Sequence, residues 1–413
     1  MNLLNSQFTQ QEIYNALHAK SGSTKIKYRF DLIRNNAVIS HVPASGSVSL
    51  NRTDKIKRTA RFEIYGECGI DWLKDYIRPV VLIGMEDKKS IVSVAVGGTW
   101  ANINARARTW EEIHEIGATW EEIAKGEKKA VSYEEQYAEF PLGVFLLASP
   151  SKEHSAEGVV YSVDAYDKTL ILSEDCITSR VVFEEGEKYT DVIESLIAGS
   201  GLQQVVITPS DTILPAQREF DIGTSRLDII NTLLSEIIYN ELYADENGII
   251  IVSPYTEPSE KNISMSYVAD ELSIISTRVS TDLDTYGVPN VFIATVSNPE
   301  LGTDLSATYI NDNPTSKLST IYRGRKIVSE LYKPDYISSQ KDLEAYIRRI
   351  AFEANQVQER ITFETAIMPT HGISEVMEIN HPCVSGIFVE DGWTIDLVPD
   401  GKMSHEGSRL VLL

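Results

Sequence analysis

The sequence has no long apolar run and only a few cysteines. None of its apolar stretches approaches the roughly 18 residues of a membrane-spanning helix, so we expect a soluble protein with no membrane insertion by this chain. The first residues lack a basic segment followed by an apolar one, which argues against a secretion signal. The cysteines Cys68, Cys176 and Cys383 are odd in number and far apart. A disulfide framework is therefore not expected, and folding in a reducing cytoplasm is the simpler interpretation.

Basic side chains are also in short supply. The chain has 38 Lys and Arg against 60 Asp and Glu, a net charge of −22. Because nucleic-acid binding depends on basic side chains that contact phosphates, this balance argues against a sequence-specific nucleic-acid partner. Two interpretations of the acidity remain open. It keeps the protein soluble, or it lines a conduit that repels DNA so that the polymer slides through.

The residue patterns of known active sites are missing as well. There is no Gly-rich phosphate loop, no nucleophile elbow and no His-Glu-x-x-His pattern. The one close His/Cys pair, His381 and Cys383, flanks a proline and has no second pair nearby, so zinc is not expected. Adjacent glutamates such as residues 134–135 and 184–185 are common in so acidic a chain and do not nominate a glycosidase. The sequence thus predicts no catalytic residue, no metal site, no cofactor and no enzyme.

What the sequence does contain is strand-like alternation. Apolar residues alternate with polar ones over residues 25–32, the period-two pattern of a half-buried antiparallel strand. The same alternation returns at Val48 and Leu50, over residues 60–64 and over residues 361–367. Repeated short strands of this kind predict an antiparallel barrel or sandwich.

Helical patterns interrupt the strands at a few places. Residues 6–20 predict a short amphipathic helix, and Thr190 can cap another. Ser225 with Asp228 resembles a capping box, and the apolar stripe that follows extends the predicted helix to Leu242. A wholly apolar run predicts a buried strand over residues 249–252, and a further helix is expected to start near residue 339.

The order of these patterns predicts an α+β fold, mostly β, in which two barrel-like tube domains flank a smaller α/β region. We expect an N-terminal helical arm over residues 1–22 and a first barrel-like tube domain over residues 23–174. A small α/β domain follows over residues 175–270. Residues 271–413 are expected to form a second barrel-like tube domain with one helix.

A ten-residue repeat sits inside the first predicted barrel, as an insertion at about residues 97–130. It places Trp100, Trp110 and Trp120 at equal spacing, with Ile113 and Ile123 at the same offset after the second and third tryptophan. The sequence Thr-Trp-Glu-Glu-Ile predicts short capped helical turns. Either these side chains pack locally, or they form a partner-docking surface, since tryptophan is enriched in binding hot spots.

Several segments, taken in order along nearly the whole chain, resemble one family, the hub proteins of the phage tail tip or baseplate and of related tail-derived particles. The segments are residues 48–61, 69–73, 77–79, 141–146, 163–168, 227–255, 288–290, 297–299, 392–395 and 401–403. The resemblance implies a homotrimer in which three chains form a ring with pseudo-sixfold symmetry. Such a ring adapts a sixfold tail tube to a threefold tip.

The resemblance also implies a location and a set of partners. We expect a virion or tail-like particle assembled in the host cytoplasm, with DNA passing through the lumen of the ring where the particle carries DNA. The implied partners are the tail tube or a distal tail protein, the C-terminus of the tape-measure protein, and a tip, fibre or wall-degrading protein. Some family members continue into a peptidase, lysozyme or fibre domain, whereas this sequence stops soon after its last predicted strand. We therefore expect wall-degrading activity in another protein. A receptor- or glycan-binding tail-tip module is the alternative, followed by a peptidoglycan hydrolase.

Overall fold

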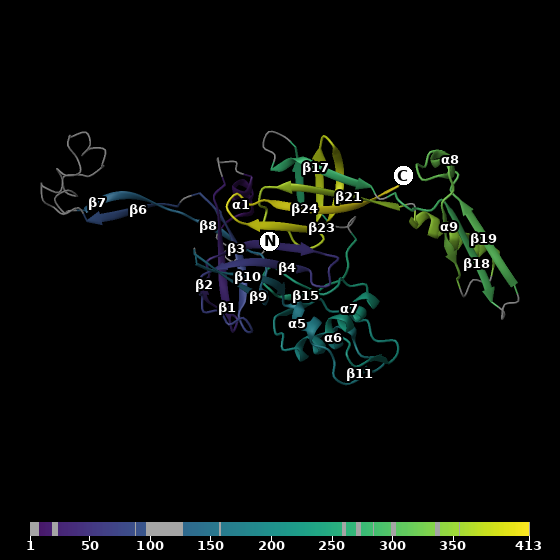
Figure 1. The fold of residues 1–413 in the computed structure, drawn as a ribbon, viewed down its shortest axis with the longest axis horizontal. Coiled ribbons are helices and arrows are strands. Elements are labelled where there is room, and N and C mark those ends of the chain that lie inside the picture. Colours follow the sequence, from purple (N-terminus) through teal and green to yellow (C-terminus); the bar gives the residue numbers. More distant parts are fainter. Residues whose placement is uncertain are drawn as a thin grey trace. The chain divides into compact units, whose positions relative to one another are not determined.

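The computed structural model describes residues 8–18, 24–86, 88–95, 127–156, 158–257, 262–269, 274–283, 285–298, 303–334, 339–354 and 356–412. Within these residues strands far outnumber helices, and most strands pair antiparallel (Figure 1). This confirms the α+β, mostly-β fold class that the sequence predicts. In the part of the chain that the structure describes, no helix combines the length and the apolar character needed to span a membrane.

The chain divides into two compact units. The first comprises residues 1–44, 63–163 and 246–248, and the second comprises residues 45–62, 164–245 and 249–413. The division falls inside β4 (Arg58–Tyr65) and β10 (Gly158–Asp167), so each of these strands contributes residues to both units. The unit boundaries therefore do not coincide with the ends of secondary-structure elements.

The first unit is built on an antiparallel sheet in the order β2–β1–β5–β9–β10, with β8 also paired to β5. Its further strands are β1 (Ile26–Arg34), β2 (Ala37–His41), β5 (Tyr76–Gly84), β8 (Tyr137–Pro141) and β9 (Phe145–Ser155). A separate two-stranded ribbon is formed by β6 (Lys88–Ala95) and β7 (Glu127–Glu134). These strands account for the β texture that the sequence shows between residues 25 and 163.

The N-terminal helix is shorter than the sequence predicts. Within the described residues α1 (Gln10–Leu17) begins at a capping box, in which Thr9 and Glu12 bond reciprocally. Ile13 and Leu17 are buried, as an amphipathic helix requires, but the apolar ring of Tyr14 is exposed. The cap fixes the start of the helix, and an apolar stripe alone does not show how far it extends.

The strand β1 is confirmed, but its burial is not limited to one face. Phe30 and Leu32 are buried as the alternation predicts. Asp31, on the predicted solvent face, is buried too, because Arg29 and Arg78 both contact its carboxylate, at 2.8 and 2.7 Å. Charge pairing of Asp31, together with the burial of Ile33, thus covers the second face of this strand.

The second unit contains a larger sheet in the order β17–β21–β24–β23–β3–β4. Its strands are β3 (Ala44–Asn51), β17 (Ile275–Leu283), β21 (Gln356–Thr365), β23 (Val384–Leu397) and β24 (Met403–Leu412). Two more strands extend this sheet next to β23. The strand β22 (Val376–His381) pairs with β23, and β16 (Met265–Val268) pairs in parallel with β22. The core of this part includes Tyr267, Phe363, Met377 and Phe388. We call β16, β17 and β21–β24 the C-terminal sheet.

A compact α/β part of the second unit lies between β10 and β16. Its elements are α5 (Thr169–Glu174), β11 (Val181–Phe183), α6 (Tyr189–Gly199), β12 (Val205–Ile207), β13 (Arg218–Phe220), α7 (Arg226–Glu236), β14 (Tyr243–Ala244) and β15 (Ile250–Val252). Apolar side chains of α6, α7 and β15 share one core. This region contains the predicted helix, turn and buried strand.

Two helix boundaries in this part differ from the prediction. Thr190 does not cap α6, because the helix already begins at Tyr189 with Lys188 at the cap position. Ser225 caps α7 as predicted, accepting the N–H of Asp228, but the helix ends at Glu236 and does not reach Leu242. The chain leaves the helix through Ile238, whose φ of 58° is incompatible with a right-handed turn.

A third part of the second unit is a small sheet covered by one helix. The sheet has the order β19–β18–β20 and consists of β18 (Val291–Asn298), β19 (Thr303–Ile310) and β20 (Val328–Tyr332). The short helix α8 (Thr320–Arg323) precedes β20, and α9 (Gln340–Ala354) packs Leu343, Ile347 and Ala351 against β18 and β19. The helix expected near residue 339 is therefore confirmed.

Candidate functional site

The predicted docking residues Trp100, Trp110, Trp120, Ile113 and Ile123 lie outside the residues that the structure describes. The described chain stops at Ala95 and resumes at Glu127, which are paired at the end of the β6–β7 ribbon. The repeat therefore connects the two strands of a hairpin. Whether its tryptophans dock a partner stays a prediction.

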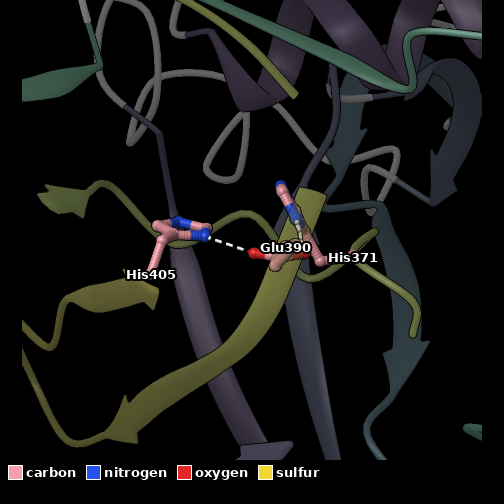
Figure 2. A group of neighbouring side chains, drawn as sticks. All are labelled: His371, Glu390 and His405. Atoms are coloured by element: carbon pink, nitrogen blue, oxygen red, sulfur yellow. Dashed lines mark hydrogen bonds and ion pairs between the residues drawn. The ribbon is translucent and has the colours of Figure 1, made fainter. Parts of the chain in front are cut away.

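The structure brings together a buried group that the sequence analysis missed: His371, Glu390 and His405 (Figure 2), which we call the His–Glu–His cluster. Glu390 lies on β23, His405 lies on β24, and His371 lies in the loop between β21 and β22. Nδ1 of His371 is 2.7 Å from Glu390 Oε2, and Nδ1 of His405 is 2.7 Å from Glu390 Oε1. All three side chains have no solvent-accessible surface.

A β-bulge in β23 lies next to Glu390. The pairing of β23 with β24 shifts register between Glu390 and Gly392. Before the bulge the buried residues of β23 are Phe388 and Glu390, and after it they are Trp393 and Ile395. The bulge thus changes which alternate residues face inward. Period-two alternation from Phe388 places Glu390 on the inner face, whereas alternation from Trp393 and Ile395 places it on the outer face. The sequence pattern alone therefore leaves the side of Glu390 undecided.

A second layer of side chains holds both imidazole rings in place. The Tyr267 hydroxyl lies 2.6 Å from Nε2 of His371, and the Thr365 hydroxyl lies 2.9 Å from Nε2 of His405. Phe363 stacks on the ring of His405, with centroids 4.7 Å apart and planes inclined by 11°. Because every ring nitrogen has a partner, the two rings cannot rotate without breaking hydrogen bonds.

The pKa values of the two histidines in the cluster are shifted in opposite directions. Burial opposes the charged form of His371, but the adjacent Glu390 carboxylate outweighs it and raises the pKa of His371. Burial lowers the pKa of His405 despite its hydrogen bond to Glu390, and the charge on His371 lowers it further. Burial also opposes ionisation of Glu390, yet the two histidines hold its pKa below the usual range. Glu390 is thus ionised while one imidazole is charged.

The His–Glu–His cluster contains residue types that bind metals, so its fit to an ion can be examined. A zinc ion lies about 2.0–2.2 Å from each imidazole nitrogen or carboxylate oxygen. Here each Nδ1 faces a carboxylate oxygen directly at 2.7 Å, the separation of a charge-assisted hydrogen bond. The space between donor and acceptor holds a proton, and the arrangement does not fit a coordinated ion.

The first unit presents a different kind of feature, a rigid turn with an exposed apolar tip. The carboxylate of Asp75 binds Arg34 through both oxygens, at 2.6 and 2.7 Å, and accepts the N–H of Asp71 at 2.8 Å. Asp71 in turn accepts the N–H of Leu73, whose side chain is 95% exposed. Trp72 packs against Tyr161, with ring centroids 5.0 Å apart. Leu73 thus presents an exposed apolar side chain at the tip of a hydrogen-bonded turn, and we call it the Leu73 knob.

Comparisons with known proteins rest on structure alone. No protein-family profile and no curated protein matches the sequence. The fold is similar to that of a tail protein from Neisseria meningitidis MC58, with a TM-score of 0.51 and 10% identity over 93% of this chain and 97% of that chain. It is also similar to the 43 kDa tail protein of prophage MuSo2 from Shewanella oneidensis, with a TM-score of 0.53 and 10% identity over 93% and 98%. The resemblance in fold to phage tail proteins that the sequence predicts is confirmed.

Proposed function

We propose that this chain is a structural hub of a phage-type tail tip or baseplate and has no enzymatic role. The observation that carries the proposal is the likeness in fold to two phage-type tail proteins over nearly the full length of all three chains. The sequence resemblance to tail-tip hubs supports the same role independently, since it rests on segments spread over the whole chain.

The character of the His–Glu–His cluster supports a structural rather than a catalytic role. Histidine and glutamate are common general acids and bases, but a catalytic group must lie within hydrogen-bond reach of its substrate. His371, Glu390 and His405 have no exposed side-chain surface, and each of their polar atoms already has a protein partner. This cluster stabilises the C-terminal sheet and offers no surface for a reaction.

In the proposed assembly three chains form a ring that joins the tail tube and the end of the tape-measure protein to the tip complex. Each chain brings a net charge of −22, and a ring of three acidic chains repels DNA that passes through its lumen. The proposed partners are a tail-tube or distal tail protein, the C-terminus of the tape-measure protein, and a tip, fibre or wall-degrading protein. The Leu73 knob is suited to a contact within this assembly, because its apolar side chain is exposed and gains from burial against a partner.

Native mass spectrometry of the full chain tests the proposal. The expected result is a threefold stoichiometry, either for the purified protein at high concentration or for the protein in an assembled particle. Leu73→Asp is expected to weaken assembly without lowering the urea midpoint, because the side chain is exposed. Ile222→Asp is the matched control, since Ile222 is also an exposed apolar residue but lies on the second unit.

Three outcomes would contradict parts of this proposal. Binding of the isolated protein to a glycan array would favour a receptor-binding module instead. Clearing of peptidoglycan by the purified protein in a zymogram would show an enzyme. A protein that remains a monomer within an assembled tail would contradict the ring.

A further inference from the structure

The hydroxyl of Thr365 favours a proton on Nε2 of His405. This hydroxyl donates to the carbonyl of Ala366 at 2.7 Å and has no second proton to donate. Its contact with Nε2 of His405 therefore requires an N–H on that nitrogen. Nδ1 of the same ring faces the Glu390 carboxylate, which only accepts hydrogen bonds when it is ionised. With Glu390 ionised, His405 satisfies both contacts only when each of its nitrogens carries a proton, so its hydrogen bonds favour the cationic ring.

His371 completes its hydrogen bonds with one proton fewer. Its Nδ1 donates to Glu390, and its Nε2 can accept from the Tyr267 hydroxyl at 2.6 Å. A neutral ring satisfies both contacts. Electrostatics nevertheless favour charge on His371, because the carboxylates of Glu390 and Glu375 both attract it. The geometry therefore favours the cation on His405 and the charges favour it on His371, so the two rings compete for one proton across Glu390.

We propose that His371, Glu390 and His405 stabilise the C-terminal sheet only while the two histidines share one proton. We call this arrangement the proton lock. With one proton shared between the two rings, the cluster has one cation and one carboxylate and is neutral inside the core. Uptake of a second proton leaves one imidazolium without a counter-charge from Glu390, and loss of the shared proton leaves Glu390 without a cation. Both changes bury an unpaired charge, which loosens the packing of β16, β21, β23 and β24 around the cluster.

Two further titratable groups among the described residues face the cluster. Tyr267, from β16, stays protonated, because burial raises its pKa well above the ordinary range. Glu375, which precedes β22, is the other carboxyl near His371, and its Oε2 has no hydrogen-bond partner in the described structure. The remaining neighbours, Thr365 and Phe363 on β21, do not titrate in this range. Glu375→Gln therefore leaves the two histidines and Glu390 as the titrating groups.

The direction of the pH dependence follows from the two histidines. His405 has a pKa below its ordinary value of 6.5, so below pH 6.5 the unfolded chain takes up a proton that the folded chain refuses. Stability falls as the pH decreases through that window. His371 has a pKa above 6.5, so stability falls as the pH rises from 6.5 through its folded value. The lock predicts maximum stability near pH 6.5, with a loss on both sides.

The primary test reads the protons directly in the wild-type protein. In samples with ¹⁵N-labelled histidine, the expected result is that the rings of His371 and His405 titrate as a coupled pair holding one shared proton at neutral pH. Two rings that titrate independently at the ordinary histidine value would overturn the proposal. So would equimolar Zn²⁺ displacing the Nδ1 protons of both rings, since the site would then be a metal site.

Variants in the Glu375→Gln background test the two losses of stability separately, through the urea midpoint measured as a function of pH. We call the loss below pH 6.5 the acid limb of the curve and the loss above it the alkaline limb. His405→Gln is expected to remove the acid limb and keep the alkaline one, because His371 still pairs with Glu390. Glu390→Gln is expected to remove the alkaline limb and deepen the acid one. His154→Gln, in the exposed part of β9, is the matched control and should leave the curve unchanged. Equal curves for all the variants would overturn the lock, and if a variant does not fold, the histidine spectra of the wild type decide.

Discussion

Asp167 joins β10 to β4 through a buried carboxylate whose Oδ2 accepts the N–H of Arg58 at 3.0 Å. Its other oxygen accepts the N–H of Thr169 at 2.8 Å and also the Thr169 hydroxyl. These bonds fix the point at which β10 turns into α5. The carboxylate is fully buried, and burial raises its pKa against the effect of these hydrogen bonds. The turn from β10 into α5 therefore depends on the two carboxylate oxygens of Asp167, which accept these hydrogen bonds although their burial is unfavourable.

Asp167→Ala is expected to destabilise the protein strongly, because it leaves two buried N–H groups without an acceptor, at about 1–3 kcal/mol each. Asp167→Asn keeps one acceptor oxygen and is expected to cost less. Urea unfolding followed by circular dichroism measures both. An alanine variant as stable as the wild type would show that water or a local shift replaces the carboxylate.

Asn290, which directly precedes β18, is a second buried polar side chain whose loss is expected to destabilise the protein. Its Nδ2 donates to the carbonyls of Leu318 and Arg325, and its Oδ1 accepts the N–H of Ile327 at 2.7 Å. Asn290→Ala leaves that N–H without its acceptor, a loss of about 1–3 kcal/mol. Asn313→Ala removes an exposed amide and is the control, with a smaller expected loss in the urea midpoint. Equal effects of the two substitutions would contradict this account.

Glu375→Gln is expected to stabilise the protein increasingly as the pH rises. Burial and the nearby Glu390 charge raise the pKa of Glu375, so ionisation above its ordinary value of 4.5 costs more in the folded chain than in the unfolded one. Glutamine removes this cost. The urea midpoint of the variant, compared with wild type at about pH 5 and about pH 8, should show the larger gain at the higher pH. A larger gain at the lower pH would contradict the assignment.

The tryptophan repeat provides a prediction about partners. If Trp110 and Trp120 dock another tail protein, then Trp110→Ala with Trp120→Ala should weaken its capture by at least tenfold, in line with the energies of binding hot spots, about 2 kcal/mol or more. Pull-down with the candidate tail proteins measures the change. An unchanged urea midpoint is the control for folding. Capture at wild-type strength would leave the local-packing interpretation of the repeat.

The parts of the fold that the sequence predicts well are those that local patterns determine. The alternation of Ala60, Phe62 and Ile64 corresponds to three buried positions of β4, and Ser225 caps α7 as predicted. Such patterns depend only on residues that are close together in the sequence. The end of α7 depends instead on the turn at Ile238, which the apolar stripe does not indicate.

The His–Glu–His cluster could not be predicted for a related reason. His371, Glu390 and His405 come from one loop and two strands, and no spacing along the chain marks them as neighbours. The bulge at Glu390 changes the inward-facing register of β23. An acidic residue in a sequence with 60 acidic side chains carries no sign that it is buried. Only the pairing of β23 with β24 reveals it.

Electron cryomicroscopy of the assembled tail tests the central claim most directly, since it shows copy number and position together. The hub predicts three copies of this chain in a closed ring between the end of the tail tube and the tip, with an acidic lumen. A single copy at the periphery, or a ring whose lumen is neutral or basic, would contradict it.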